Sequence, residues 1–160
     1  MEDKITIRRA EMGDLEKILV LAEKLSKEEY KKYGENLNFE WLRQQERKIF
    51  TDSLNDADSL IAVAQSDDRI IAYLRASLYR DDQMLWRVGR GAELYDIFIE
   101  EEFRSQKIGA RLMDAFLDWC QTKKADYVLV FVASLNGKAA GFYKKLGFKD
   151  YQIILEKKIR

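Results

Sequence analysis

The chain of 160 residues has no histidine and one cysteine, Cys120. Without histidine, a general base must be a carboxylate, tyrosine, lysine, cysteine or water, and Ser–His and Cys–His nucleophilic pairs are excluded. A single cysteine excludes an intrachain disulfide and a zinc cluster of cysteines, so we expect no metal. Carboxylates and tyrosines remain as the main candidates for acid–base chemistry.

Proline is also absent, so turns must depend on Gly, Asn, Asp and Ser. There is no long uncharged apolar run of the kind that spans a membrane, and the charged first four residues do not resemble a signal peptide. The 28 Lys and Arg balance the 28 Asp and Glu, which gives no electrostatic attraction for nucleic acid or an anionic membrane. We therefore expect a cytoplasmic protein that binds neither.

Length and composition are those of a globular protein, with 47% apolar and 35% charged residues. A chain of this length buries about 70% of its unfolded surface in one core. No repeat, low-complexity tract or linker interrupts it. We expect a single domain over residues 1–160.

Hydrophobic periodicity predicts strands and helices in the order β-α-α-β-β-β-α-β-α-β, which is typical of an α/β fold with a mixed sheet and helices on its faces. Strands are predicted at Lys4–Arg9, Ser59–Gln65, Arg69–Tyr79, Ala92–Ile99, Tyr127–Val132 and, in one or two segments, Phe148–Lys158. Helices are predicted at Leu15–Leu25, Phe39–Ser53, Ser105–Lys124 and Asn136–Leu146. In the second helix, Trp41, Leu42, Ile49 and Phe50 are the expected apolar anchors.

The strand Ala92–Ile99 leads into Arg104–Ala110, a segment predicted to form a tight turn at the start of a helix. Backbone N–H groups at a helix N-terminus have no intrahelical acceptor, and the helix dipole is positive there. Such a turn favours an anionic ligand, so we expect a phosphorylated one.

Two blocks carry a resemblance to a known family. The first is the strand followed by Arg104-x-x-x-x-Gly109-Ala110-x-Leu112, and the second is Asn136-x-x-Ala139-x-x-x-Tyr143-x-x-x-Gly147-Phe148. With both blocks in this order, the chain resembles the GNAT family, the acetyl-CoA-dependent N-acyltransferases. The resemblance implies a mixed, mostly antiparallel sheet of six to seven strands with about four flanking helices and a splayed central strand pair. It also implies transfer of an acetyl group to a small-molecule or peptide amine, and dimers are common in the family.

The resemblance places acetyl-CoA along the first block. Its pantetheine would pair like an extra strand with the main chain of Ile97, Phe98 and Ile99. Its pyrophosphate would accept backbone hydrogen bonds from the segment after Arg104, which is Ser105, Gln106, Lys107, Ile108, Gly109 and Ala110. Lys107 stands where the family pattern has a glycine. It loses the freedom of glycine for positive φ and adds a cation near a phosphate.

Asn136 and Tyr143 in the second block each allow two interpretations. Asn136 is a favoured N-cap residue, and the resemblance adds a contact with CoA. Tyr143 can be a packing residue, or it can protonate the departing CoA thiolate, since a phenol with a pKa of about 10 can do so and recover its proton from solvent.

Glu93 and Asp96 are the candidates for the base that accepts the amine proton. Strand alternation puts Glu93, Tyr95 and Ile97 on one face and Asp96 on the other. A carboxylate on a central strand between apolar residues tends to have a raised pKa. Either carboxylate can instead pair with an arginine such as Arg75, Arg87 or Arg90, and a chain of waters without a single base is the remaining alternative. We favour Glu93.

The resemblance implies an acceptor site built from the connection between the first two helices and from the turn Asp81–Gly91. Acidic and aromatic side chains there suit a cationic amine, although the helix end at Lys27–Lys32 can equally be plain solvated surface. The candidates are Tyr30, Tyr33, Glu35, Trp86 and Tyr95. Cys120 lies on an apolar helix stripe and is expected to be a buried small hydrophobe, so the amine would attack the thioester directly. A non-catalytic acyl-CoA-binding sensor or scaffold is the alternative function.

Overall fold

The computed structural model describes residues 5–33, 38–79 and 88–159, and the chain divides into two compact units, Met1–Val130 and Phe131–Arg160. The strands are β1 (Ile5–Arg9), β2 (Ser59–Ser66), β3 (Arg69–Leu78), β4 (Gly91–Ile99) and β5 (Tyr127–Val130). The helices are α1 (Leu15–Tyr33), α2 (Phe39–Asn55), α3 (Ile108–Thr122) and α4 (Gly137–Lys145), with short 3-10 turns η1 (Met12–Asp14) and η3 (Glu101–Phe103). In the described ranges, no helix is long and apolar enough to cross a membrane.

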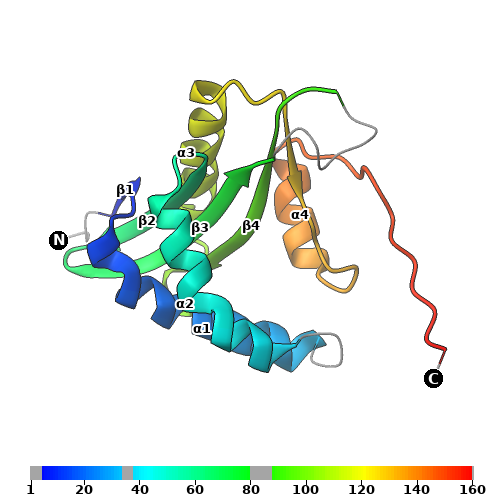
Figure 1. Cartoon of the computed structure of the whole chain (residues 1–160), viewed down its shortest axis with the longest axis horizontal. Coiled ribbons are helices and arrows are strands. Elements are labelled where there is room, and N and C mark those ends of the chain that lie inside the picture. The colour runs from blue at the N-terminus through cyan, green and yellow to red at the C-terminus, as the bar shows by residue number, and fades with distance from the viewer. Residues whose placement is uncertain (1–4, 34–37, 80–87, 160) are drawn as a thin grey trace. The chain divides into compact units, whose positions relative to one another are not determined.

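The five strands of the first unit form one sheet in the order β1-β2-β3-β4-β5 (Figure 1). All neighbours are antiparallel except β4 and β5, which are parallel. The predicted mixed, mostly antiparallel sheet and the four helices are therefore confirmed. The expected six to seven strands are wrong for the described part of the chain, which has five.

The missing strands were expected in Phe148–Lys158, which has no regular secondary structure. After Phe148, its apolar side chains, including Ile153 and Leu155, are exposed. Apolar residues favour a strand locally, but a strand forms only where a neighbour pairs with it. β5 is likewise shorter than the predicted strand Tyr127–Val132, and its residues are half-buried.

Helices cover both faces of the sheet (Figure 1). On one face, α1 and α2 contribute Ile18, Leu21 and Phe50 to a core that also contains Tyr73 and Phe98 from the strands. On the other face, α3 contacts β2, β3 and β4 and buries an apolar stripe of Ile108, Leu112, Met113, Phe116 and Cys120. Burial of these apolar side chains stabilises the three layers.

The first two helices differ from the prediction in detail. α1 continues through Tyr33 instead of ending near Leu25, because the charged segment after Leu25 has good helix formers and lacks proline. In α2, Phe50 is buried as expected, but Trp41 is 54% exposed and does not anchor the helix.

A β-bulge interrupts the β3–β4 ladder and decides which side chains of β4 share a face. Arg75 is opposite Asp96, and Ser77 is opposite Glu93, so β4 has one extra residue between these pairs. Residues directly opposite each other in an antiparallel ladder lie on the same face. Because Tyr73, Arg75 and Ser77 alternate regularly, both Glu93 and Asp96 lie on the face that α1 and α2 cover.

The second unit contains α4, which begins after Asn136 and ends before Gly147. The Asn136 side chain accepts a hydrogen bond from the Ala139 N–H at 3.1 Å and caps the helix, as expected. At the other end Gly147 has φ +90°, a conformation that favours glycine, and closes the helix. Tyr143 is buried and its ring lies 5.2 Å and 5.6 Å from the rings of Phe142 and Phe148.

Candidate functional site

β4 has a strand partner on both sides only over its first half. β5 pairs with it from Gly91 to Leu94, and Tyr95–Ile99 continue without a β5 partner in the described part of the chain. Backbone N–H and C=O groups left over on that side of β4 can bond an extended ligand. The stretch of β4 beyond the β5 ladder includes Ile97–Ile99, the segment expected from the sequence to pair with pantetheine.

The turn after β4 presents the N-terminus of α3. Lys107 is the N-cap residue of α3, and its side chain forms no capping hydrogen bond. Ser105, Gln106 and Lys107 are exposed, whereas Ile108 and Gly109 are buried at the start of the helix. The first N–H groups of an α-helix have no intrahelical acceptor, so this turn can bind an anion through its backbone.

Two residues of this turn have a backbone conformation that glycine favours. Ser105 has φ +66° and Lys107 has φ +61°. The left-handed region costs a residue with a side chain roughly 1–2 kcal/mol. Lys107 therefore adopts the positive φ expected of the glycine that it replaces, at the cost of strain.

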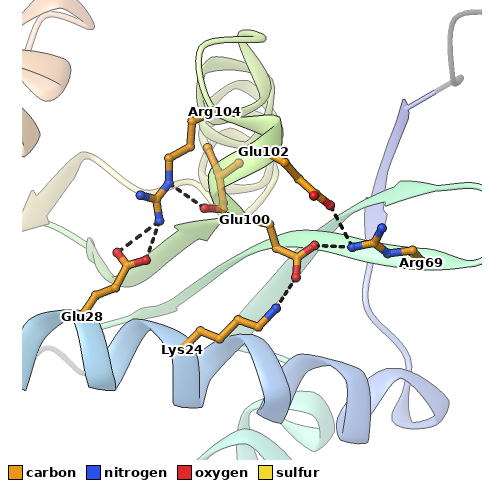
Figure 2. Close-up of polar contacts among 7 residues, drawn as sticks. Lys24, Glu28, Arg69, Glu100, Glu102 and Arg104 are labelled. Atoms are coloured by element: carbon orange, nitrogen blue, oxygen red, sulfur yellow. Dashed lines mark hydrogen bonds and ion pairs between the residues drawn. The ribbon is translucent and has the colours of Figure 1, made fainter.

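Arg104 directs its side chain toward α1 (Figure 2). Its Nε donates to the carbonyl oxygen of Ile99 at 2.9 Å, and its Nη2 donates to both carboxylate oxygens of Glu28 at 2.8 and 3.1 Å. The guanidinium also lies 5.6 Å from the centre of the Phe98 ring. Arg104 thus links the end of β4 to α1, a role that the motif did not predict.

A second ionic group lies next to this link (Figure 2). The buried carboxylate of Glu100 accepts hydrogen bonds from Lys24 on α1 and, at 2.8 Å, from Arg69 at the start of β3. Arg69 also reaches Glu102 at 3.1 Å. Together with Arg104–Glu28, these contacts hold α1 against the segment that connects β4 to the anion-binding turn.

The two candidate bases lie on the same face of the sheet, which corrects the prediction that Asp96 faces the opposite way from Glu93. The period-two rule fails here because the β-bulge inserts one residue between them. Asp96 accepts a hydrogen bond from Arg75 Nε at 2.6 Å, which is the arginine pairing considered as an alternative.

Glu93 is in a different environment. Burial is the main cause that raises the pKa of Glu93, and the Asp96 carboxylate raises it further. Hydrogen bonds from Tyr79 and Tyr95 and the charge of Arg75 act in the opposite direction but are outweighed. A carboxylate with a raised pKa is better suited to accept a proton near neutral pH.

The acceptor candidates are only partly placed. Tyr95 is 43% exposed, its hydroxyl lies 2.9 Å from Ser77 Oγ, and the Arg75 guanidinium lies 4.6 Å from the centre of its ring. Tyr30 lies on α1 and is half-exposed. Tyr33 ends α1, but its side chain is outside the described parts, as are Glu35 and Trp86.

Further charged side chains come from the helices to the same face. Glu29 on α1 and Glu46 on α2 are partly buried, and Asp96 raises the pKa of both, after burial as the main cause. With Tyr73, Arg75, Glu93 and Asp96 they form what we call the Asp96 cluster. Sequence analysis missed Glu29 and Glu46, although Glu29 continues the apolar stripe of α1 and Glu46 lies one turn before Phe50.

Cys120 is buried in α3, as expected. Burial raises its pKa to about 12, so the thiol stays protonated near neutral pH and is a poor nucleophile. In the described ranges, no three His, Cys, Asp or Glu side chains come together as metal ligands would.

The comparisons with known proteins identify the family. The model of the acetyltransferase (GNAT) family matches residues 21–148. The chain belongs to this family.

Its sequence relatives are distant. It is 22% identical over 152 residues to an N-alpha-acetyltransferase of Sulfurisphaera tokodaii, covering 92% of this chain and 82% of the relative. It is 25% identical over 152 residues to a thialysine N-epsilon-acetyltransferase of Bos taurus, covering 91% and 85%. A shorter match, 30% identical over 63 residues, covers 39% of this chain but only 28% of an uncharacterised N-acetyltransferase of Methanocaldococcus jannaschii.

Solved structures share the fold at low identity. A mutant of the BH1408 protein from Bacillus halodurans has a TM-score of 0.82 at 20% identity, covering 97% of this chain and 99% of that one. An aminoglycoside N-acetyltransferase in complex with CoA has a TM-score of 0.79 at 17% identity, covering 100% and 98%. These neighbours confirm the GNAT fold.

Proposed function

We propose that the protein is an acetyl-CoA-dependent N-acetyltransferase that transfers an acetyl group to a primary amine within a ternary complex. The observation that carries this proposal is the second half of β4. Its backbone lacks a β5 partner in the described part, it leads into the N-terminus of α3, and it lies next to Glu93, whose pKa is raised. We propose that the two units form one acetyltransferase domain, because the family match includes parts of both.

The residues present fit acetyl-CoA. The main chain of Ile97–Ile99 would hold the pantetheine, and the backbone of residues 105–110 would hold the pyrophosphate. The exposed Lys107 side chain would add a cation. The neighbour that was solved with CoA supports this choice of ligand. A main-chain N–H near Ile97 or Phe98 would donate to the acetyl carbonyl oxygen, a contact that can stabilise a transition state by roughly 3 kcal/mol.

When bound, acetyl-CoA supplies an acetyl thioester, whose carbonyl carbon accepts the amine lone pair as the C–S bond breaks. Glu93 takes the proton that the attacking nitrogen loses, since Asp96 is already paired with Arg75. We propose that Tyr143 gives its proton to the sulfur and regains one from solvent, so that the products are an N-acetyl amine and CoA thiol. Cys120 takes no part, because its thiol is buried and protonated.

A thiol-release assay tests this function. The protein is incubated with acetyl-CoA and a panel of amines, and free CoA thiol and acetylated amine are both measured. Equal amounts of thiol and N-acetyl product with at least one amine are expected. Tight binding of acetyl-CoA without turnover of any amine would favour the sensor function instead.

A further inference from the structure

Glu100 stands where the chain leaves β4 and turns toward α3. Its N–H donates to the carbonyl oxygen of Ile71 on β3 at 3.0 Å, and its own carbonyl oxygen accepts the Phe103 N–H at 2.9 Å, across the turn η3. The backbone of this one residue therefore belongs both to the sheet and to the turn. It separates the two stretches proposed to bind acetyl-CoA, Ile97–Ile99 and Ser105–Ala110.

The side chain of Glu100 is held by cations from two other elements (Figure 2). Glu100 is only 9% exposed. One oxygen of its carboxylate accepts a hydrogen bond from Lys24 on α1, and the other accepts one from Arg69 at the start of β3, at 2.8 Å. A buried carboxylate destabilises a fold unless cations and hydrogen bonds compensate it. These contacts therefore tie α1 and β3 to the end of β4 at a single residue.

The backbone that follows this junction is strained. Ser105 has φ +66° and Lys107 has φ +61°. Residues with side chains keep such conformations only where the surrounding structure holds them there, and strain of this kind gathers at ligand-binding turns. Arg104, directly before the strained turn, bonds the carbonyl oxygen of Ile99 and the carboxylate of Glu28 on α1. The segment that leads into the turn is thus tied to α1 at both of its ends.

We propose that Glu100 is a positioning residue whose carboxylate, held by Lys24 and Arg69, keeps the turn Ser105–Ala110 in the conformation that binds acetyl-CoA. The inference rests on the proposed function, because it concerns the binding of that substrate. A turn that already has its bound conformation loses less conformational freedom on binding, so Glu100 increases affinity. Because it acts through the backbone of the turn, Glu100 leaves the chemistry of acetyl transfer unchanged.

Glu100→Gln tests this role, because it keeps the shape of the side chain and removes its charge. Lys24 and Arg69 can then turn to solvent, since their side chains are already 50% and 63% exposed. We expect the Kd for acetyl-CoA, measured by calorimetry, to rise about tenfold, the effect of one charge-assisted contact. KM for acetyl-CoA should rise with it, while kcat at saturating acetyl-CoA stays within about twofold of the parent.

Asp14→Asn is the matched control. Asp14 is also a buried carboxylate, 8% exposed, and it accepts two hydrogen bonds from Arg8, at 2.7 and 2.8 Å. Its other partner is the N–H of Glu11, so its contacts lie in β1 and at the start of η1 and not in the segment between β4 and α3. Asp14→Asn should lower the melting temperature, as Glu100→Gln does, and leave the Kd for acetyl-CoA unchanged.

Two further measurements separate a positioning role from a loss of stability. In the free protein, hydrogen exchange of residues 105–110 should be faster in Glu100→Gln than in the parent and unchanged in Asp14→Asn. Lys24→Gln removes the same contact from the half-exposed side, and it decides the question if Glu100→Gln does not fold. If Glu100 acts through Lys24, the double variant Lys24→Gln/Glu100→Gln has the same Kd as Glu100→Gln alone.

The outcomes separate this inference from the function on which it rests. An unchanged Kd in Lys24→Gln and in folded Glu100→Gln overturns the inference and leaves the acetyltransferase intact. An equal rise in Asp14→Asn also overturns it, because the effect would then follow from lost stability. Fully additive effects in the double variant overturn the route through Lys24. If the parent neither binds nor uses acetyl-CoA, the proposed function fails, and hydrogen exchange in the free protein decides whether Glu100 holds the turn.

Discussion

Arg104 and Glu28 are 76 residues apart in sequence, yet one guanidinium nitrogen of Arg104 contacts both oxygens of the Glu28 carboxylate, at 2.8 and 3.1 Å. The same guanidinium holds the carbonyl of Ile99. The residue that begins the expected pyrophosphate turn therefore also fixes α1, which carries the acceptor candidate Tyr30. Through this contact, the acetyl-CoA side and the acceptor side of the proposed site share one support.

Arg104→Lys should weaken this support, because a lysine is a single point charge and cannot bond the carboxylate and the carbonyl in the same geometry. We expect the free energy of unfolding to fall by about 1–3 kcal/mol, with weaker binding of acetyl-CoA. Chemical denaturation and calorimetry measure the two effects. Arg47→Lys is the control: Arg47 forms a two-pronged pair with Glu16 at 2.7 and 2.9 Å, but both partners are mostly exposed and the change should be smaller. Equal losses in the two variants would contradict a special role for Arg104.

Two substitutions of Lys107 separate the effect of its strained backbone from the effect of its side-chain charge. Lys107→Ala removes the cation and keeps the strained φ of +61°, whereas Lys107→Gly removes both. The glycine variant should be more stable than the alanine variant by about 1 kcal/mol. If the side chain contacts a phosphate, both variants bind acetyl-CoA more weakly than the parent. Identical melting temperatures for the two variants would show that the positive φ is not strained.

The contribution of Glu46, in the Asp96 cluster, to the stability of the protein should fall as pH rises. The folded-state pKa of Glu46 is raised, mainly by burial, so its contribution to stability is fully present below the unfolded-state pKa and is lost as pH rises through the folded-state value. Glu46→Gln should therefore raise the melting temperature near about pH 7 but much less near about pH 4.

Asp14 is the control for Glu46, because its effect on the melting temperature should depend on pH in the opposite direction. A hydrogen bond from Arg8 is the main cause that lowers the pKa of Asp14, so its stabilisation is present above the unfolded-state pKa and is lost as pH falls through the folded-state value. Asp14→Asn should lower the melting temperature near about pH 7 and near about pH 4, and much less near about pH 2, below the unfolded-state pKa of about 3.9. If the melting temperatures of Glu46→Gln and Asp14→Asn changed with pH in the same direction, the environments assigned to Glu46 and Asp14 would be contradicted.

Replacement of Glu93 tests whether this residue is the general base that accepts the amine proton. In the parent, kcat should rise with pH through the raised pKa of Glu93, above the ordinary glutamate value of about 4.3. Glu93→Gln should remove this limb of the profile and lower kcat by about 10²–10⁴-fold. An unchanged pH limb in Glu93→Gln would assign the proton transfer to Asp96 or to a chain of waters.

Tyr143→Phe tests whether Tyr143 is the acid that protonates the departing CoA thiolate. The variant keeps the ring that lies against Phe142 and Phe148 and removes the hydroxyl proton. We expect kcat to fall by about 10²-fold or more while the affinity for acetyl-CoA stays close to that of the parent. Tyr151→Phe, in the exposed segment of the same unit, is the control for a lost phenol. Full turnover in Tyr143→Phe would leave Tyr143 with a packing role alone.

Local sequence patterns predicted most of the fold. The apolar stripe of α3 and the caps of α4 depend on residues three or four apart, so the pattern contains the whole signal. The strand expected after Phe148 depends on pairing with another segment, which periodicity does not report. The same limit applies to β5, whose apolar run is longer than its ladder.

The candidate site was predicted less completely, for two physical reasons. One extra residue in β4 reverses the alternation, so the sequence put Glu93 and Asp96 on opposite faces although they share one. Long-range contacts give no local signal, so Arg104 was assigned to the ligand turn without its bond to Glu28. A glutamate within an apolar helix stripe, as at Glu29 and Glu46, is the kind of signal that could have indicated the Asp96 cluster.

Hydrogen exchange measured by mass spectrometry, with and without acetyl-CoA, tests the central claim most directly. Bound acetyl-CoA should slow exchange of the backbone N–H groups in Ile97–Ile99 and in Ser105–Ala110, because these groups would bond pantetheine and pyrophosphate. The segment Tyr151–Ile159, whose residues are exposed and have no regular secondary structure, provides an internal reference. Unchanged exchange in both segments at saturating acetyl-CoA would contradict the account.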